Sequence, residues 1–171
     1  MKKPVLFVML VLGLIFMTQR VFAQKAKYQS MFIYNFSKYI RWPDSFRQDV
    51  FSISTYGEDE LHLALQQMAD MKKQLNGMPI KVKRCNSVDE IETSHIIFVA
   101  PSKLSDFQAI QSKFASLPVL IITEAPGMAE KGAAINFVEQ GGKIKFELNE
   151  SETERKNLKV ASQLKTLAIL I

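Results

Sequence analysis

Short apolar segments separated by helical patterns are the feature that most constrains the fold of this chain. Residues 95–100 and 119–123 are apolar almost throughout, which is typical of strands covered on both faces. Two more strands are predicted at residues 51–56 and 80–85, and helices at residues 25–40, 59–71, 87–91 and 105–116. Strands that alternate with helices predict a mostly parallel sheet flanked by helices.

The last third of the chain has a different pattern. Residues 134–139 and 143–148 are strand-like and are separated by Gln140-Gly141-Gly142, a spacing typical of a tight hairpin. Asn149 begins a polar helical turn, and residues 160–171 carry leucine and alanine at helical spacing. The sequence therefore predicts a single α/β domain with a mixed, mostly parallel sheet, ending in an antiparallel hairpin and a C-terminal helix.

Residues 1–23 have the features of an export signal. Lys2 and Lys3 precede an apolar run over residues 5–17, and Val21 and Ala23 are suitable residues at the third and first positions before a cleavage site. The run is shorter than the roughly 20 residues that a spanning helix needs. We predict a signal peptide over 1–23, cleaved near Ala23, and a mature α/β domain over 24–171. An uncleaved N-terminal anchor is the alternative.

The charge of the chain argues against nucleic acid as a partner. The 22 basic and 17 acidic residues give a net charge of +5. Loss of the export signal removes Lys2, Lys3 and Arg20 and lowers this charge to +2. The remaining charges are mixed in sign and form no basic stripe that could neutralise phosphates.

The residue types that usually carry chemistry do not form a recognisable motif. Cys85 is the only cysteine, so no disulfide can form within the chain. Neither His62 nor His95 has a second ligand at a metal-binding spacing. Gly57 is followed by three acidic residues, which would repel a nucleotide phosphate. The sequence therefore predicts a protein that is not an enzyme and that has no metal or cofactor.

Several polar residues lie inside apolar or aromatic runs. Asn35 and Lys38 lie within the aromatic run 34–39, and Asn136 lies between Ile135 and Phe137. Burial of such groups costs a few kcal/mol unless they are hydrogen-bonded. They are expected to form either an internal network that joins helix to sheet or a surface that binds a ligand or partner.

A ligand site is also expected where parallel strands end. Carboxyl ends of such strands meet at one edge of an open sheet, which here brings together residues 56–58, 100–103 and 123–124. Tyr34, Trp42 and Thr123 are the candidates for the walls of a small-ligand pocket.

Five segments together resemble one family of exported bacterial proteins, the YfiR-like family. They are Tyr34-Asn35-Phe36 with Lys38-Tyr39 and Trp42-Pro43, then Gly57, then Gly132 to Ile135-Asn136-Phe137, then Lys145-Phe146-Glu147-Leu148-Asn149, and finally Leu158 to Leu164. Their order and spacing follow the family pattern, and the resemblance spans nearly all of residues 24–171.

The resemblance implies a periplasmic α/β protein that is not an enzyme. Such a protein restrains a membrane-bound diguanylate cyclase, or a related sensor kinase, by binding its periplasmic domain, and so influences cyclic di-GMP and biofilm formation. Disulfides that tie some members to the redox state cannot form within this chain. The candidate residues for binding a partner or ligand are Tyr34, Asn35, Lys38, Trp42, Thr123, Asn136, Phe146 and Asn149, and the hairpin and closing segment, residues 136–164, form the candidate contact surface.

Three other hypotheses remain open from the sequence. The chain could be a periplasmic sensor or carrier of a small ligand that feeds a histidine kinase, and this role is compatible with the first. It could pair with a second copy of itself. It could also be a hydrolase, which would require Ser102 or Cys85 to lie near His95.

Overall fold

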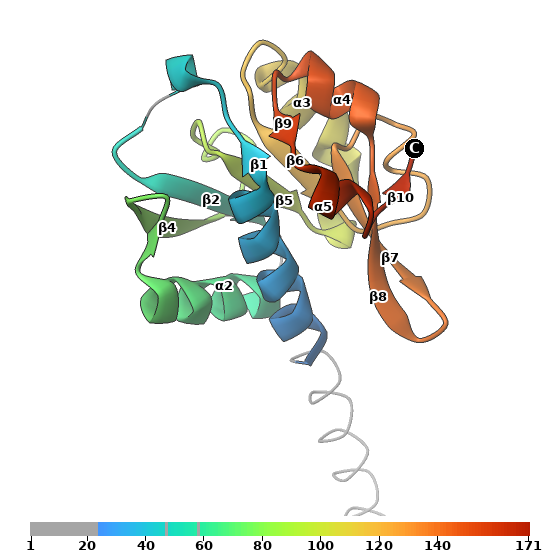
Figure 1. Ribbon diagram of the computed structural model, residues 1–171, viewed down its shortest axis with the longest axis horizontal. Helices are drawn as coiled ribbons and strands as arrows, with labels where there is room; N and C mark the ends of the chain where they lie inside the picture. The colour runs from blue at the N-terminus through green and yellow to red at the C-terminus, as the bar shows by residue number, and fades with distance from the viewer. Residues whose placement is uncertain (1–23, 47, 58) are drawn as a thin grey trace, which may run out of the picture.

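A curved eight-stranded sheet forms the centre of the molecule (Figure 1). The computed structural model describes residues 24–171 except Arg47 and Glu58, so the predicted export signal lies outside the described residues. The strands are β1 (Ile40–Arg41), β2 (Phe51–Tyr56), β3 (Gln74–Leu75), β4 (Met78–Cys85), β5 (Ile96–Val99), β6 (Leu120–Thr123), β7 (Ile135–Gln140), β8 (Lys143–Leu148), β9 (Lys159–Val160) and β10 (Ile169–Leu170).

Helices cover both faces of this sheet. The first, which we call the N-terminal helix, is described over residues 24–39. The others are α2 (Asp59–Lys72), α3 (Phe107–Lys113), α4 (Glu150–Arg155) and α5 (Ser162–Lys165), with short 3-10 helices η1 (Asp44–Phe46) and η2 (Pro101–Asp106). None of the helices within the described ranges is both long enough and apolar enough to cross a membrane.

The sheet is mixed and mostly parallel. Its strand order is β10-β8-β7-β6-β5-β2-β4-β3. From β4 through β2, β5 and β6 to β7, each strand is parallel to the next. Beyond this block, β8 is antiparallel to β7 and β3 is antiparallel to β4. A separate two-stranded ribbon pairs β1 with β9. The predicted fold class is confirmed, including the hairpin, where Gly141 and Gly142 have φ angles of 62° and 70° that suit a tight turn.

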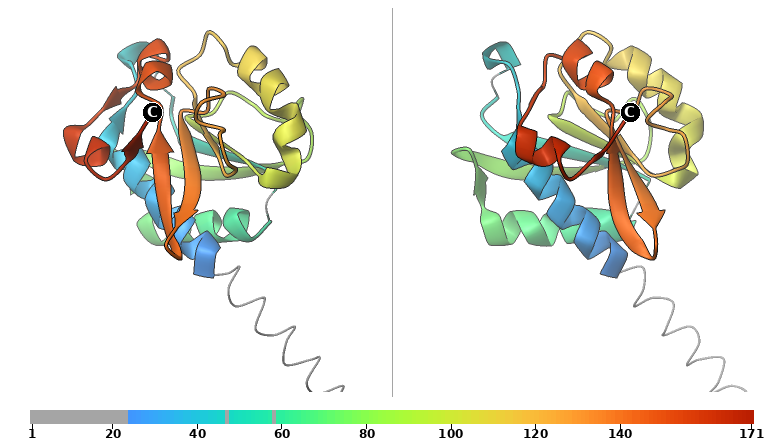
Figure 2. Two further views of the ribbon diagram at one scale, coloured as in Figure 1. Left: turned by 90° about the vertical axis from the view of Figure 1, so that its right-hand side faces the viewer. Right: turned by 45° about the vertical axis from the view of Figure 1, so that its right-hand side comes forward.

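Alternation along the central strands divides the interior into two apolar layers. In β5, Ile96 and Phe98 point to one layer and Ile97 and Val99 to the other, as the period of two in a strand requires. The first layer lies beneath the N-terminal helix and α2, and the second beneath α3. Figure 2 shows these helices on opposite sides of the sheet. Two-sided cover explains why β5 is apolar throughout and β6 is apolar except for Thr123.

The N-terminal helix is held by an aromatic cluster. Phe36 is fully buried and its ring centroid lies 4.9 Å from that of Phe146 and 5.9 Å from that of Phe137. Phe32 joins the same cluster at 5.8 Å from Phe146. Because β7 and β8 supply two of the four rings, the cluster fixes the helix across the hairpin.

The opposite side of this helix is exposed. Tyr28, Met31 and Tyr39 are exposed despite their apolar rings and chains. Asn35 and Lys38 are exposed as well, so of the two roles expected for them the structure favours a surface position over a buried network. A helix turns about 100° per residue, and a continuous aromatic run such as 34–39 therefore covers both sides of it.

Three predicted helices differ from the structure. Residues 87–91 form a turn, in which the Ile91 amide donates to the Val88 carbonyl at 3.2 Å. The segment is too short to repay the cost of nucleating a helix. The predicted helix 105–116 begins within η2 and continues as α3. The C-terminal helix is present but covers only Ser162–Lys165, because β9 and β10 take the residues on either side.

Replacing Phe36 by alanine tests the aromatic cluster. Loss of a fully buried phenylalanine leaves a cavity, so Phe36→Ala should lower the free energy of unfolding by about 3–5 kcal/mol in urea denaturation. The neighbouring Asn35 is exposed, and Asn35→Ala should change stability by less than about 0.5 kcal/mol. Equal effects of the two substitutions would contradict this packing.

Candidate functional site

Asn136 is the centre of a buried hydrogen-bond network at the carboxyl end of β6. Its Oδ1 accepts from Thr123 Oγ1 at 2.8 Å and from the Ala125 amide at 3.1 Å. Its Nδ2 donates to the Ala125 carbonyl at 2.9 Å and to Glu147 Oε2 at 2.8 Å. Two donors and two acceptor positions are all that an asparagine side chain offers. The geometry therefore supports the internal network, one of the two roles expected for Asn136.

Glu124 extends this network to the N-terminal helix. It accepts a hydrogen bond from Gln29 Nε2 at 2.8 Å and forms an ion pair with Lys25. Gln29 is buried, so its amide needs such a partner. Polar contacts at this edge consequently join the helix to β6, as the aromatic cluster joins it to β7 and β8.

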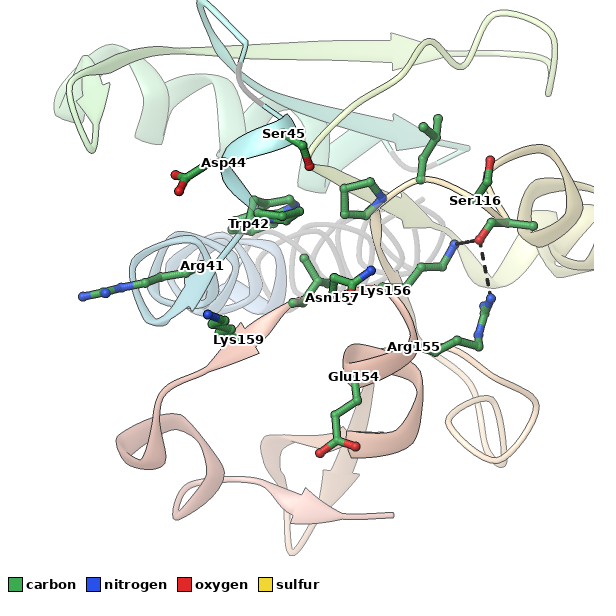
Figure 3. A pocket seen from close by; sticks show the side chains of 15 residues that line it. Arg41, Trp42, Asp44, Ser45, Ser116, Glu154, Arg155, Lys156, Asn157 and Lys159 are labelled. Atoms are coloured by element: carbon green, nitrogen blue, oxygen red, sulfur yellow. Dashed lines mark hydrogen bonds between the residues drawn. The ribbon is translucent and has the colours of Figure 1, made fainter.

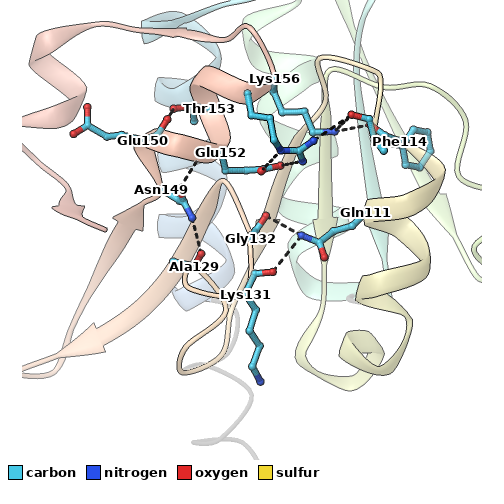
Figure 4. A network of polar contacts seen from close by, with 12 residues as sticks. Gln111, Phe114, Ala129, Lys131, Gly132, Asn149, Glu150, Glu152, Thr153 and Lys156 are labelled. Carbon is cyan, nitrogen blue, oxygen red and sulfur yellow. Dashed lines mark hydrogen bonds and ion pairs between the residues drawn. The ribbon is translucent and has the colours of Figure 1, made fainter.

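A second network fixes α4 (Figure 4). Asn149 caps this helix, because its Oδ1 accepts from the Glu152 amide at 2.8 Å, while its Nδ2 donates to the Ala129 carbonyl at 2.8 Å. Glu152 accepts from Arg155 Nε at 2.8 Å and from Nη2 at 2.7 Å. This two-point ion pair is a strong, directional contact.

Lys156 joins α4 to the end of α3. The residue is 3% exposed, and its Nζ donates to the carbonyls of Phe114 and Ala115. Burial, and secondarily the charge of Arg155, lower the pKa of Lys156. An ammonium group at the C-terminal carbonyls of a helix is favourable because those carbonyls lack partners within the helix.

A buried histidine lies at the opposite, amino-terminal ends of the central strands. The ring of His95 stacks on Phe51 with centroids 4.4 Å apart and meets Trp42 and Phe46 edge-on at 5.5 and 5.2 Å. Its Nδ1 accepts from the Ser52 amide at 3.2 Å. Burial lowers the pKa of His95 from 6.5 to about 4, so the ring is neutral near pH 7.

Trp42 also forms part of the wall of an open cavity of about 870 Å³. The cavity lies between the β1–β9 ribbon, η1, the turn over residues 115–118 and the end of α4 (Figure 3). Trp42 Nε1 is buried and has no hydrogen-bond partner among the described residues. An unpaired buried donor is costly, and a ligand atom in the cavity could accept from it only after the indole turned to expose the N–H.

Two cations lie on one side of this cavity. Arg41 and Lys159 are directly opposite each other in the β1–β9 ribbon, and both are exposed. Figure 3 shows both side chains on the same side of the cavity. Like charges placed opposite each other on paired strands destabilise the pair. An anionic group bound beside them would attract both cations and so offset their mutual repulsion.

The residues predicted to bind a partner or ligand occupy separate environments. Thr123 and Asn136 share one network, Phe146 lies in the aromatic cluster, Asn149 caps α4, and Trp42 lines the cavity. The other three, Tyr34, Asn35 and Lys38, lie on the N-terminal helix. The structure brings the carboxyl ends of β2, β5 and β6 together as expected. Trp42, however, lies at the amino-terminal ends of these strands, beside His95.

The cavity was not anticipated from the sequence. Two of its cations, Arg41 and Lys159, come from strands of two residues each, and such short strands have no detectable periodicity. Only the sequence Arg41-Trp42, a cation beside an aromatic residue, could have indicated the site.

The register of the sheet rules out the hydrolase arrangement. Cys85 is aligned through Tyr56 with Val99, four residues along β5 from His95. This separation amounts to about 13 Å along the strand direction, and Ser102 lies beyond the same end. The thiol or hydroxyl and the imidazole therefore cannot act together. Within the described ranges, no group of three or more His, Cys, Asp or Glu side chains could hold a metal ion.

Comparison with solved structures gives matches of low sequence identity. The ABC domain from Streptococcus pneumonia, determined in complex with L-Trp, matches with a TM-score of 0.51 and 14% identity, over 71% of this chain and 55% of that one. A conserved domain protein from Vibrio cholerae O1 biovar eltor matches with a TM-score of 0.46 and 11% identity, over the same shares. This chain thus spans 55% of the length of each, and the first likeness concerns the fold alone.

The class defined by the fold is a single α/β domain with a mostly parallel sheet. The YfiR/HmsC-like family model matches residues 26–169, and the chain belongs to this family. The resemblance seen in the sequence is therefore confirmed. Comparison with curated proteins gives no match.

The buried His95 predicts a pH dependence of stability. The folded protein keeps this ring neutral down to a pKa of about 4, whereas the unfolded chain binds a proton near pH 6.5. The free energy of unfolding should therefore fall as the pH drops from 6.5 to 4, by at most about 1.4 kcal/mol per pH unit from this group. Urea denaturation at several pH values measures this slope. His95→Gln should make the dependence flatter over the same interval, and an unchanged slope would contradict it.

Proposed function

We propose that this protein is a periplasmic regulator that binds the periplasmic domain of a membrane-bound diguanylate cyclase, or of a related sensor kinase, and restrains it. The observation that carries the proposal is the family match over residues 26–169. The protein acts by binding and not by catalysis. Residues 1–23 direct export and are removed near Ala23, in keeping with the signal features of the sequence.

The contact surface in this proposal is the hairpin and closing segment, residues 136–164. Asn136, Phe146 and Asn149 act from beneath this surface, since their contacts are internal and hold β7, β8 and α4 in place. The partner is contacted by exposed neighbours, such as Lys143 at the hairpin turn. Restraint of a cyclase would lower cyclic di-GMP in the cytoplasm and disfavour biofilm.

Deletion of the gene tests the regulatory role. Loss of a restraining protein should raise cellular cyclic di-GMP, measured by mass spectrometry, and increase biofilm. The unaltered gene should restore the lower level, and so should Gln108→Glu, which adds a charge at an exposed position of α3. Lys143→Glu should restore it less well, because it reverses a charge in the proposed contact. Unchanged cyclic di-GMP after deletion would contradict the proposal.

A second role, recognition of a small anionic ligand, is favoured by the cavity beside Trp42. The unpaired indole N–H and the adjacent cations Arg41 and Lys159 are the features that support it. Such a ligand would report on the periplasm to the membrane partner. The two roles meet at residues 154–159, which line the cavity and also belong to the proposed contact surface. The hairpin turn lies at the other end of the molecule from β1 and α4 (Figure 1), so Lys143 can contact the partner without closing the cavity.

Thermal denaturation with inorganic phosphate and short carboxylates tests this second role. A ligand at 100 times its dissociation constant should stabilise the protein by about 2.7 kcal/mol. Trp42→Phe keeps an aromatic ring but removes the donor, and Lys159→Gln removes one cation, so each should reduce the shift. Lys113→Gln on α3 provides a control outside the cavity. A shift that survives both cavity substitutions would contradict binding at this site.

A further inference from the structure

An apolar groove separates the N-terminal helix from α2. Its volume is about 750 Å³, and its walls include Met31 and Tyr34 from the first helix and Leu63, Met68 and Met71 from the second. On each helix the lining positions recur at intervals of three and four residues, which places them on one side of that helix. Figure 1 shows the two helices crossing on the same face of the sheet.

The groove exposes more apolar surface than a folded domain needs to expose. Met31 is 52% exposed, Leu63 57% and Met71 74%. Neighbouring exposed apolar side chains mark interaction sites, and methionine adapts its shape to a partner. A small molecule requires enclosure on most sides, which side chains this exposed do not provide. An extended occupant would cover these side chains better than a small molecule.

Positive charge surrounds the apolar floor. The Nζ atoms of Lys38 and Lys72 lie 5.6 and 5.4 Å from the ring centroid of Tyr34, and Lys27 lines the groove. The N-terminal helix contains no acidic residue over positions 24–39. Among the described lining residues, Glu60 alone is acidic. The groove therefore complements a negatively charged partner.

This charge also argues against a second copy of the chain as the occupant. In a two-fold symmetric dimer the same patch faces itself. The lysines beside Tyr34 would then face the same lysines of the other copy, with one acidic residue in each groove to compensate. Opposed like charges disfavour that contact.

We propose that the groove binds an amphipathic helix with an apolar stripe and acidic flanks. A helix laid in a groove presents apolar residues at positions i, i+3, i+4 and i+7, which matches the spacing of the lining residues. The 14 residues of α2 offer a wall of about 21 Å, enough for four turns of the bound helix. The proposal rests on the proposed function only in assigning this helix to the regulated membrane partner.

Model peptides test the groove directly, with the protein expressed as the full chain and isolated as the cell produces it. Two fluorescent peptides of about 18 residues, five helical turns, share one leucine stripe and differ in having glutamate or lysine at all other positions. The glutamate peptide should bind, as measured by fluorescence anisotropy, and its affinity should fall as the salt concentration rises. The lysine peptide should bind at least tenfold more weakly.

Matched substitutions locate the binding. Met71→Glu places a negative charge in the groove and should lower the affinity for the glutamate peptide about tenfold or more. Gln66→Glu adds the same charge at an exposed position of α2 outside the groove and should leave affinity nearly unchanged. Lys72→Glu should shift preference toward the lysine peptide. Circular dichroism should show unchanged folding, because all three positions are exposed.

Three results would overturn the assignment. One is equal weakening by Met71→Glu and Gln66→Glu, and another is equal binding of the two peptides. The third is a native dimer that Met71→Glu converts to a monomer in light scattering, which would make a second copy the occupant. If the glutamate peptide does not bind but gene deletion still raises cyclic di-GMP, the groove is not the binding site and the proposed function stands.

Discussion

Phe36 packs against Phe146 with ring centroids 4.9 Å apart, and the arrangement of the surface depends on this contact. It joins residues 110 positions apart and sets the N-terminal helix across the hairpin strands. The helix leads directly into β1, which pairs with β9, so the position of Arg41 and Trp42 follows from the same packing. The outward side of the helix, with Met31 and Tyr34, is fixed by it as well.

Polar groups inside the domain have their partners within it. Asn136 uses both donors and both acceptor positions in contacts with Thr123, Ala125 and Glu147. Lys156 is almost completely buried and binds the carbonyls at the end of α3. Networks satisfied to this degree make the fold rigid and specific. Trp42 Nε1 is the exception among the described residues, and Trp42 lines the cavity.

The elements with strong periodicity were predictable, and those with weak local signals were not. β2 has the predicted bounds, and the hairpin follows from Gly141 and Gly142, which accept positive φ angles. The ribbon of β1 and β9 was missed because its pairing is set by tertiary packing and not by propensity. The helix 25–40 was correct as an element, but its aromatic residues are divided between two sides: Phe32 and Phe36 pack on the hairpin strands, whereas Tyr28 and Tyr39 are exposed.

That last difference has a physical cause that bears on function. A helix that only covered a sheet would bury its aromatic side and present charged residues to water. The N-terminal helix instead exposes Tyr28 and Met31, while Ala26 and Ile33 face the core. These two residues fill the interior together with Phe32 and Phe36, so the apolar residues on the outward side are not needed for folding. A partner that covered them would remove this apolar surface from water, and to do so it would have to complement the lysines around Tyr34.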